Sequence, residues 1–206
     1  MRTFLKIISY TFQPLVMPTL GMILLMQIPL FQFFGTSYRM IAIVGTFLFT
    51  GVFPALPILM MMRKGQIRDL FISRREERTM PYLFSFLAYV FWVLFLWRTL
   101  QFPIEFISVA IGVVVALVLM VFINLKWKIS AHAAGMGGFV GCILGVSFLI
   151  RINPLGLIIG TLLISGLVAI SRVYLKAHTL SQVIGGFSLG VFCVLMSVVI
   201  YNFIAN

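Results

Sequence analysis

Long apolar stretches separated by short polar segments dominate this sequence. Seven can be drawn, near residues 14–34, 40–62, 80–98, 104–124, 133–150, 154–171 and 180–203. About 20 helical residues cross a hydrocarbon core of about 30 Å, so an apolar stretch of roughly 18 or more residues is a candidate transmembrane helix. The pattern therefore predicts an all-α fold, a polytopic transmembrane bundle of six or seven helices.

The first of these stretches differs from the others because it contains Pro14, Pro18 and Pro29. Proline lacks a backbone donor and disrupts the preceding helical turn, so a membrane helix tolerates it only where neighbouring groups satisfy the freed carbonyls. We expect this stretch to be kinked, partly re-entrant or divided into two shorter pieces, which leaves both six and seven spans open. No linker or repeat divides the chain, which predicts a single integral membrane domain over residues 1–206.

Composition supports a membrane protein and excludes a soluble one. Hydrophobic residues make up 62% of the chain and charged residues 9%, whereas a soluble protein has about 45–50% and about 25%. A water-soluble domain of 206 residues could not bury so much apolar surface. Cys142 and Cys193 lie inside apolar stretches, where cysteine behaves as a small packing residue.

Charge is distributed unevenly along the chain, whose formal net charge is +11. Three of the 15 basic residues are Arg39, Arg98 and Arg151; the others lie at the N-terminus or in segments 63–79, 125–132 and 172–179. Seven spans would place these other residues on one side of the membrane. The positive-inside rule assigns that side to the cytoplasm, unless the cations serve to bind an anionic substrate, so the side stays open.

Carboxylates are too few for a metal-dependent phosphatase. The only ones are Asp69, Glu76, Glu77 and Glu105. None lies near either histidine in the sequence, and hard cations or two-metal sites need several carboxylate ligands. We therefore expect no cofactor, and the membrane setting makes nucleic acid an unsuitable partner.

Three polar islands on the basic face carry the candidate chemistry. The first is "IRDLFISRREERTMPY" (67–82), the second "KWKISAHAAGMGG" (126–138) and the third "SRVYLKAHTLSQVIGG" (171–186). His132 and His178, the only two histidines, fall in the second and third islands. Each begins an apolar stretch and lies within six residues of a lysine or arginine.

These residue types suit phosphoryl transfer. Guanidinium groups bind phosphate oxygens in a bidentate manner, and the first turn of a helix adds unpaired N–H groups. One imidazole can attack phosphorus, while a second protonates the leaving group and then activates water. Simpler explanations exist for each part, because cations anchor helix ends at lipid headgroups and small residues let helices pack closely.

The islands, taken in order, resemble the motifs of the type 2 phosphatidic acid phosphatase family of integral-membrane lipid phosphate phosphatases. "SRVYLKAH" (171–178) has the spacing of the family's third motif, Ser-Arg, five residues, His. "SAH" (130–132) is similar to the Ser-Gly-His of the second motif, and "SRREERTMP" (73–81) loosely matches the first. The resemblance covers roughly residues 63–200 and predicts a phosphatase-like core there.

The resemblance implies a role for each matching residue. His178 would be the nucleophile that forms a phosphohistidine, and His132 the general acid and then the base for water. The phosphate-binding side chains would be those of Arg172, Arg78, Arg75, Arg74 and Ser130. The implied partners are membrane lipids and a lipid phosphate or diphosphate substrate, and the implied location is a bacterial inner membrane. Neither the substrate lipid nor the oligomeric state follows from the sequence.

Gln182 is the main departure from the family pattern, which has aspartate at this position. A glutamine carbonyl can orient the imidazole of His178 but supplies no negative charge. In the serine-protease triad, the corresponding acid-to-amide change costs about four orders of magnitude in rate. The alternative is therefore a non-catalytic protein that binds or transports an anionic lipid. A small channel or transporter would need polar residues within its spans, and these spans carry few.

Overall fold

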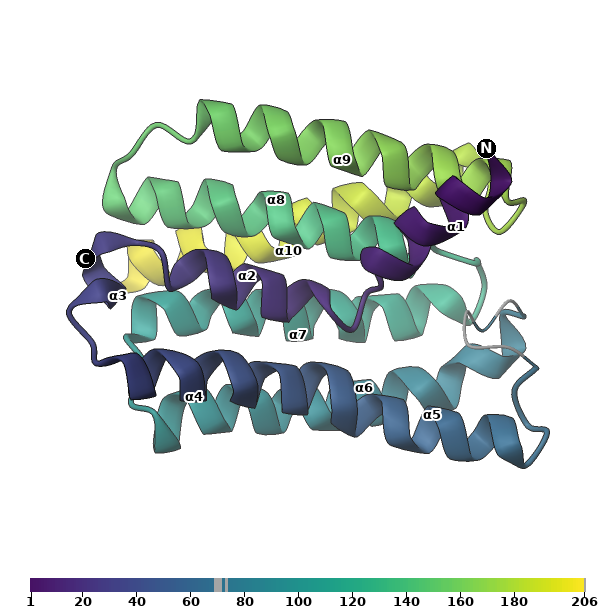
Figure 1. Cartoon of the computed structure of the whole chain (residues 1–206), viewed down its shortest axis with the longest axis horizontal. Helices are drawn as coiled ribbons and strands as arrows, with labels where there is room; N and C mark the ends of the chain where they lie inside the picture. The colour runs from purple at the N-terminus through teal and green to yellow at the C-terminus, as the bar shows by residue number, and fades with distance from the viewer. Residues whose placement is uncertain (69–71, 73, 206) are drawn as a thin grey trace. The chain divides into compact units, whose positions relative to one another are not determined.

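The computed structural model describes residues 1–68, 72 and 74–205, and every regular element among them is a helix (Figure 1). Six helices of this part are long and apolar enough to cross a membrane: Thr36–Arg63, Glu76–Thr99, Ile104–Asn124, Ala131–Ile150, Leu155–Tyr174 and Leu180–Ala205. The predicted all-α transmembrane bundle is confirmed, with six candidate spans, and the protein is a multi-pass membrane protein.

The chain forms two compact units. One combines Met1–Pro14 with Ile104–Asn206, and the other comprises Leu15–Pro103. We call the first the histidine unit because it contains His132 and His178, and the second the arginine unit because it contains the first polar island.

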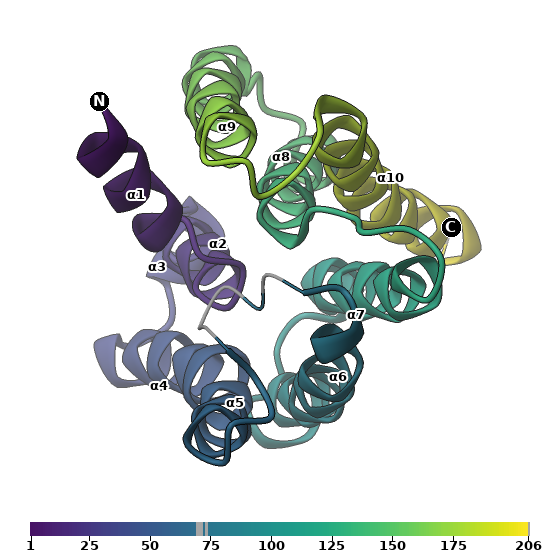
Figure 2. The same ribbon diagram turned by 90° about the vertical axis from the view of Figure 1, so that its right-hand side faces the viewer.

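The histidine unit consists of one short helix and four long ones. They are α1 (Arg2–Thr11), α7 (Ile104–Asn124), α8 (Ala131–Ile150), α9 (Leu155–Tyr174) and α10 (Leu180–Ala205). The long helices alternate in direction, so the connections 125–130 and 175–179 lie at one end of the unit, the end that faces the viewer in Figure 2. α10 packs against α8 and α7, and α1 packs against α9.

Glycines allow α8 and α10 to approach closely. A side chain at Gly190 of α10 would collide with the backbone of Ala134 and Gly138 in α8, and one at Gly137 with the backbone of Phe187. Such small-residue contacts let membrane helices pack backbone to backbone. The N-terminal half of α8 is therefore held directly against the N-terminal half of α10.

The arginine unit contains the proline-rich first stretch and two long helical spans. Its elements are α2 (Met17–Leu25), α3 (Pro29–Gln32), α4 (Thr36–Phe47), the π-turn η1 (Leu48–Val52), α5 (Phe53–Arg63), the 3₁₀ turn η2 (Glu76–Arg78), α6 (Thr79–Leu94) and the π-turn η3 (Phe95–Thr99). The first stretch is divided into two short helices, each with a proline in its first turn. Of the three alternatives expected for this stretch (kinked, partly re-entrant or divided into two shorter pieces), the structure shows the third.

One backbone irregularity in the arginine unit lies next to a proline. The π-turn η1 precedes Pro54, as expected where proline removes a helical hydrogen bond. Thr50 in this turn donates to the carbonyl of Thr46 at 2.8 Å, and its hydroxyl also reaches the carbonyl of Leu15 at 3.4 Å. α2 therefore begins level with the middle of the span Thr36–Arg63 and covers only part of its length.

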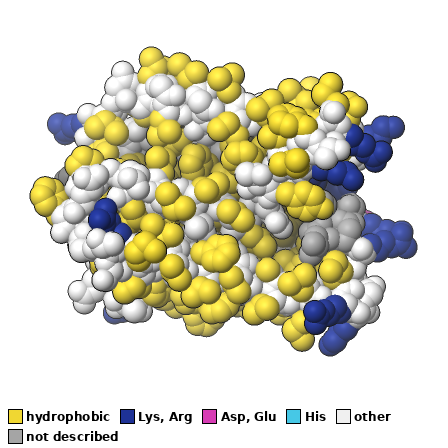
Figure 3. All heavy atoms as spheres, viewed as in Figure 1, with side chains coloured by type: hydrophobic (Ala, Val, Ile, Leu, Met, Phe, Trp, Pro, Cys, Tyr) yellow, Lys and Arg dark blue, Asp and Glu magenta, His cyan; other side chains and the backbone are white. Residues whose placement is uncertain are grey.

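Hydrophobic side chains cover the flanks of the helices in both units, whereas Lys and Arg side chains lie at helix ends (Figure 3). Leu163 in α9 and Phe192 in α10 are each more than half exposed. Apolar surface of this extent suits contact with lipid acyl chains rather than water.

Candidate active site

Both histidines lie where a helix begins, at the same end of the histidine unit. His132 is in the first turn of α8, and His178 comes two residues before α10. Only 6% of His132 and 7% of His178 is exposed. The topology that brings these helix ends together also removes both imidazoles from solvent.

Ser130 joins the second and third polar islands. It is the N-cap of α8, and its hydroxyl accepts a hydrogen bond from the backbone N–H of Ala133 at 3.4 Å. The backbone N–H of Ser130 donates to the carbonyl of Gln182 in α10 at 3.2 Å. The first turns of α8 and α10 are therefore directly bonded, and the Ser130 hydroxyl keeps its own hydrogen for another acceptor.

Gln182 sets the orientation of the His178 ring. Its Oε1 lies 3.0 Å from His178 Nδ1 and accepts from the backbone N–H of Thr179 at 3.3 Å. A peptide N–H can only donate, so the amide atom that faces it is the oxygen, and an amide oxygen can only accept. In the neutral ring, Nδ1 of His178 therefore carries the hydrogen and Nε2 carries the lone pair.

Arg172 lies in the last turn of α9 and is 3% exposed. Its carbonyl accepts from the backbone N–H groups of Ala177 at 3.0 Å and His178 at 3.2 Å. The intervening turn is closed by Lys176, which has a left-handed φ of 55°. The six-residue spacing between Arg172 and His178 thus corresponds to a tight turn built on the backbone of the arginine.

α1 contributes a residue to this end that we did not predict. The carbonyl of Ser9 lies 3.2 Å from His132 Nε2, and the hydroxyl of Ser9 accepts from Arg172 Nη1 at 3.2 Å. The same hydroxyl lies 2.6 Å from the hydroxyl of Ser171. The sequence signal is weak: Leu5 and Ser9 share one face of an amphipathic N-terminal helix, but nothing in the linear pattern pairs that face with α9.

The first polar island belongs to the arginine unit, and its arginines have different environments. Arg78 is 4% exposed, and its Nε donates to the carbonyl of Ile72 at 2.9 Å. The side chains of Arg74 and Arg75 are 55% and 34% exposed and pair with carboxylates: Arg74 Nε lies 4.0 Å from Glu77 Oε1, and Arg75 Nε lies 3.4 Å from Glu76 Oε1.

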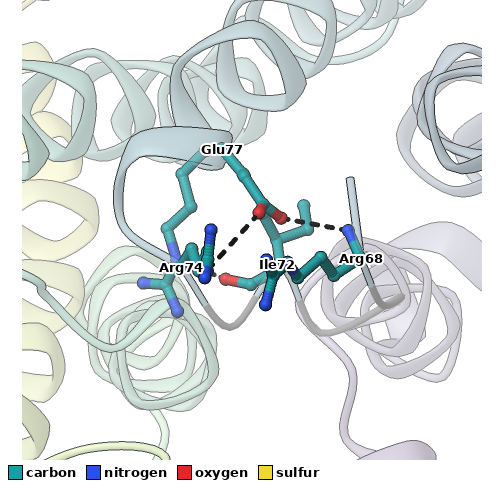
Figure 4. A network of polar contacts seen from close by, with 5 residues as sticks. Arg68, Ile72, Arg74 and Glu77 are labelled. Carbon is teal, nitrogen blue, oxygen red and sulfur yellow. Dashed lines mark hydrogen bonds and ion pairs between the residues drawn. The ribbon is translucent and has the colours of Figure 1, made fainter. Parts of the chain in front are cut away.

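Glu77 also receives a backbone hydrogen bond within this island. The backbone N–H of Arg68 donates to Glu77 Oε2 at 3.1 Å, while the other carboxylate oxygen faces Arg74 (Figure 4). Glu77 thus links the two sides of the loop. Asp69 lies outside the described residues.

Metal ligands are sparse in the described part of the chain. Within residues 1–68, 72 and 74–205, no three His, Cys, Asp or Glu side chains gather in a way that could hold a metal ion. Cys142 and Cys193 are buried free thiols.

Comparison with known proteins finds a match to a family model. Residues 122–205 match the family model described as the PAP2 superfamily, and no curated protein or solved structure matches the chain significantly. The matched range runs from the end of α7 through α10 and contains the second and third islands. This match supports a phosphatase-type fold. The match at residues 122–205 is to the family that the motifs predicted.

Proposed function

We propose that this protein is a membrane phosphatase that hydrolyses a lipid phosphate or diphosphate through a phosphohistidine at His178, without a metal ion. The observation that carries the proposal is the contact between His178 Nδ1 and Gln182 Oε1 at 3.0 Å. It leaves the lone pair of the neutral ring on Nε2, the atom that attacks phosphorus. The match of residues 122–205 to the PAP2 superfamily model supports a phosphoester hydrolase in general terms.

In the first step, the lipid phosphate lies against the guanidinium of Arg172 and the first turn of α8. Charge-assisted hydrogen bonds and helix N-terminal N–H groups both favour an anion at this position. Nε2 of His178 attacks phosphorus, and the bond from phosphorus to the lipid oxygen breaks. A protonated His132 gives its proton to that oxygen, so the lipid leaves as an alcohol, or as a monophosphate when the substrate is a diphosphate.

In the second step, water hydrolyses the phosphoenzyme. His132, now neutral, takes a proton from the water as its oxygen attacks phosphorus, and the P–N bond breaks. His178 returns to its neutral form and inorganic phosphate leaves. The Ser130 hydroxyl, which retains a hydrogen to donate, supplies a further bond to the phosphate oxygens.

Gln182 supports this mechanism only in part. Its amide oxygen keeps the His178 ring in the required tautomer, but it offers no negative charge to the cationic ring of the phosphoenzyme. This favours one alternative function, a non-catalytic protein that binds an anionic lipid with the same groups.

The roles of Arg78, Arg75 and Arg74 rest on the family resemblance. Arg78 is the buried one of these three arginines, so it is the first that mutagenesis should replace. In this proposal, the apolar tail of the substrate lies among exposed hydrophobic side chains of the helices. The membrane that we propose is a bacterial inner membrane.

A phosphate-release screen tests the function. Purified protein in detergent micelles is presented with a panel of lipid phosphates and diphosphates, with and without EDTA, beside His178→Ala. We expect release from at least one lipid, little effect of EDTA and complete loss in the variant. Release that persists in His178→Ala, or that is abolished by EDTA, contradicts the mechanism.

A further inference from the structure

Ser9 places two oxygen atoms against two groups that the proposed mechanism uses. Its carbonyl faces His132 Nε2 and its hydroxyl accepts from Arg172 Nη1, each at 3.2 Å. Ser9 is fully buried although it belongs to a short N-terminal helix. A buried hydroxyl is unfavourable unless it is hydrogen-bonded, so these contacts account for a serine at this position.

The hydrogen bonds around Ser9 have a defined direction. Arginine can only donate, so the Ser9 hydroxyl accepts from Arg172. Ser171 donates to the carbonyl of Leu5 at 2.8 Å, which uses its only hydrogen. Ser9 therefore donates to Ser171 across their 2.6 Å contact. The relay runs from the guanidinium through two hydroxyls to a backbone carbonyl of α1, and each hydroxyl donates once and accepts once.

The exposed apolar side chains of α1 explain how this helix can hold Ser9 against His132 and Arg172. Leu5 is buried with Ser9 one turn apart, whereas Phe4, Ile7 and Tyr10 are each more than half exposed. An amphipathic helix with exposed apolar side chains lies in the membrane interface. Lipid on one face and α9 on the other thus fix α1, and α1 in turn fixes Ser9.

We propose that Ser9 is a positioning residue of the phosphatase: its hydroxyl holds the guanidinium of Arg172 in the orientation that receives phosphate, and its carbonyl holds the ring of His132. This inference rests on the proposed function. A mutation can separate the roles of the two oxygens, because Ser9→Ala removes the hydroxyl and leaves the backbone carbonyl in place. The substitution should therefore weaken phosphate binding through Arg172 while the contact to His132 persists.

Ser171→Ala is the matched control. It also deletes one buried hydroxyl from the α1–α9 interface, but it leaves the bond between Arg172 and Ser9 intact. Thermal midpoints of both variants in detergent show how much each change loosens the interface. A purely structural role for Ser9 predicts that the two variants behave alike.

The experiment measures kcat, KM and the inhibition constant of inorganic phosphate for the wild-type protein and both variants in mixed micelles. For Ser9→Ala we expect KM and the inhibition constant to rise roughly tenfold, because bonds to charged groups are the stronger ones, with kcat within about threefold. For Ser171→Ala we expect all three constants within about threefold of wild type, since a neutral pair contributes less. Equal effects in the two variants, or an increase in activity in Ser9→Ala, overturn the inference.

A separate binding measurement distinguishes failure of the inference from failure of the proposed function. If wild type hydrolyses no lipid in the panel, the proposed function fails, and the affinity for phosphatidic acid in micelles decides the role of Ser9. Weaker binding in Ser9→Ala than in Ser171→Ala supports positioning of Arg172. Equal affinities overturn it.

Discussion

The backbone N–H of Ser130 donates to the carbonyl of Gln182 at 3.2 Å, so the first turn of α8 is bonded to the first turn of α10. Gln182 in turn contacts the ring of His178, and Ser130 lies two residues before His132. Ser9 and Arg172 complete a circuit of contacts through the same end of the unit. Its members are Ser130, His132, Ser9, Arg172, His178 and Gln182.

Gln182→Asp should increase kcat by at least about tenfold, because a carboxylate keeps the same tautomer of His178 and adds a charge that stabilises the cationic ring. Steady-state phosphate release from the best lipid of the panel measures the effect. Gln182→Ala, which removes the acceptor, should lower kcat below wild type. If neither wild type nor Gln182→Asp releases phosphate from any lipid, lipid binding becomes the better description.

Arg172→Lys should lower kcat/KM by roughly a hundredfold, because lysine keeps the charge but lacks the planar fork that binds two phosphate oxygens and the Ser9 hydroxyl together. Arg151→Lys, at the opposite end of α8, is the control and should change kcat/KM by less than about twofold, since an exposed cation contributes little. A lysine variant at 172 with wild-type kcat/KM would exclude bidentate binding by this residue.

Gly190→Ala should destabilise the histidine unit by about 1–3 kcal/mol, the usual effect of overpacking. The added methyl group would meet the backbone of Ala134 and Gly138, which cannot rotate away. Gly160→Ala in α9 is the matched control: no described atom lies within 4 Å of its added carbon, and alanine is the better helix former. Thermal unfolding in detergent compares them, and equal midpoints would argue against backbone-to-backbone packing of α8 and α10.

The spans could be predicted from the sequence because lipid forces each crossing segment to be both apolar and helical. The prolines of the first stretch predicted an irregularity there without deciding its form, and the structure shows that Pro18 and Pro29 lie in the first turns of two separate short helices. The sequence also predicted that the second and third islands lie at the same end of the bundle, because alternating spans return every second connection to the same side of the membrane.

Ser9 could not be predicted in the same way. Its contact with Ser171 joins positions 162 residues apart, and it depends on how α1 docks on α9 rather than on any local pattern. The different environments of Arg74, Arg75 and Arg78 could not be predicted either. These arginines lie close together in the sequence, and only the fold decides which of them is buried.

The most direct test of the account is a rapid-quench search for the phosphoenzyme. Protein is mixed with a lipid substrate labelled in its phosphate, quenched in alkali, in which phosphohistidine survives, and digested so that the labelled residue can be located by mass spectrometry. His132→Ala should both gain and lose the label more slowly than wild type, because His132 is the acid of the first step and the base of the second. We predict that the phosphate is found on His178 and that His178→Ala carries none. Turnover without any labelled protein, or a label on another residue, would contradict the mechanism.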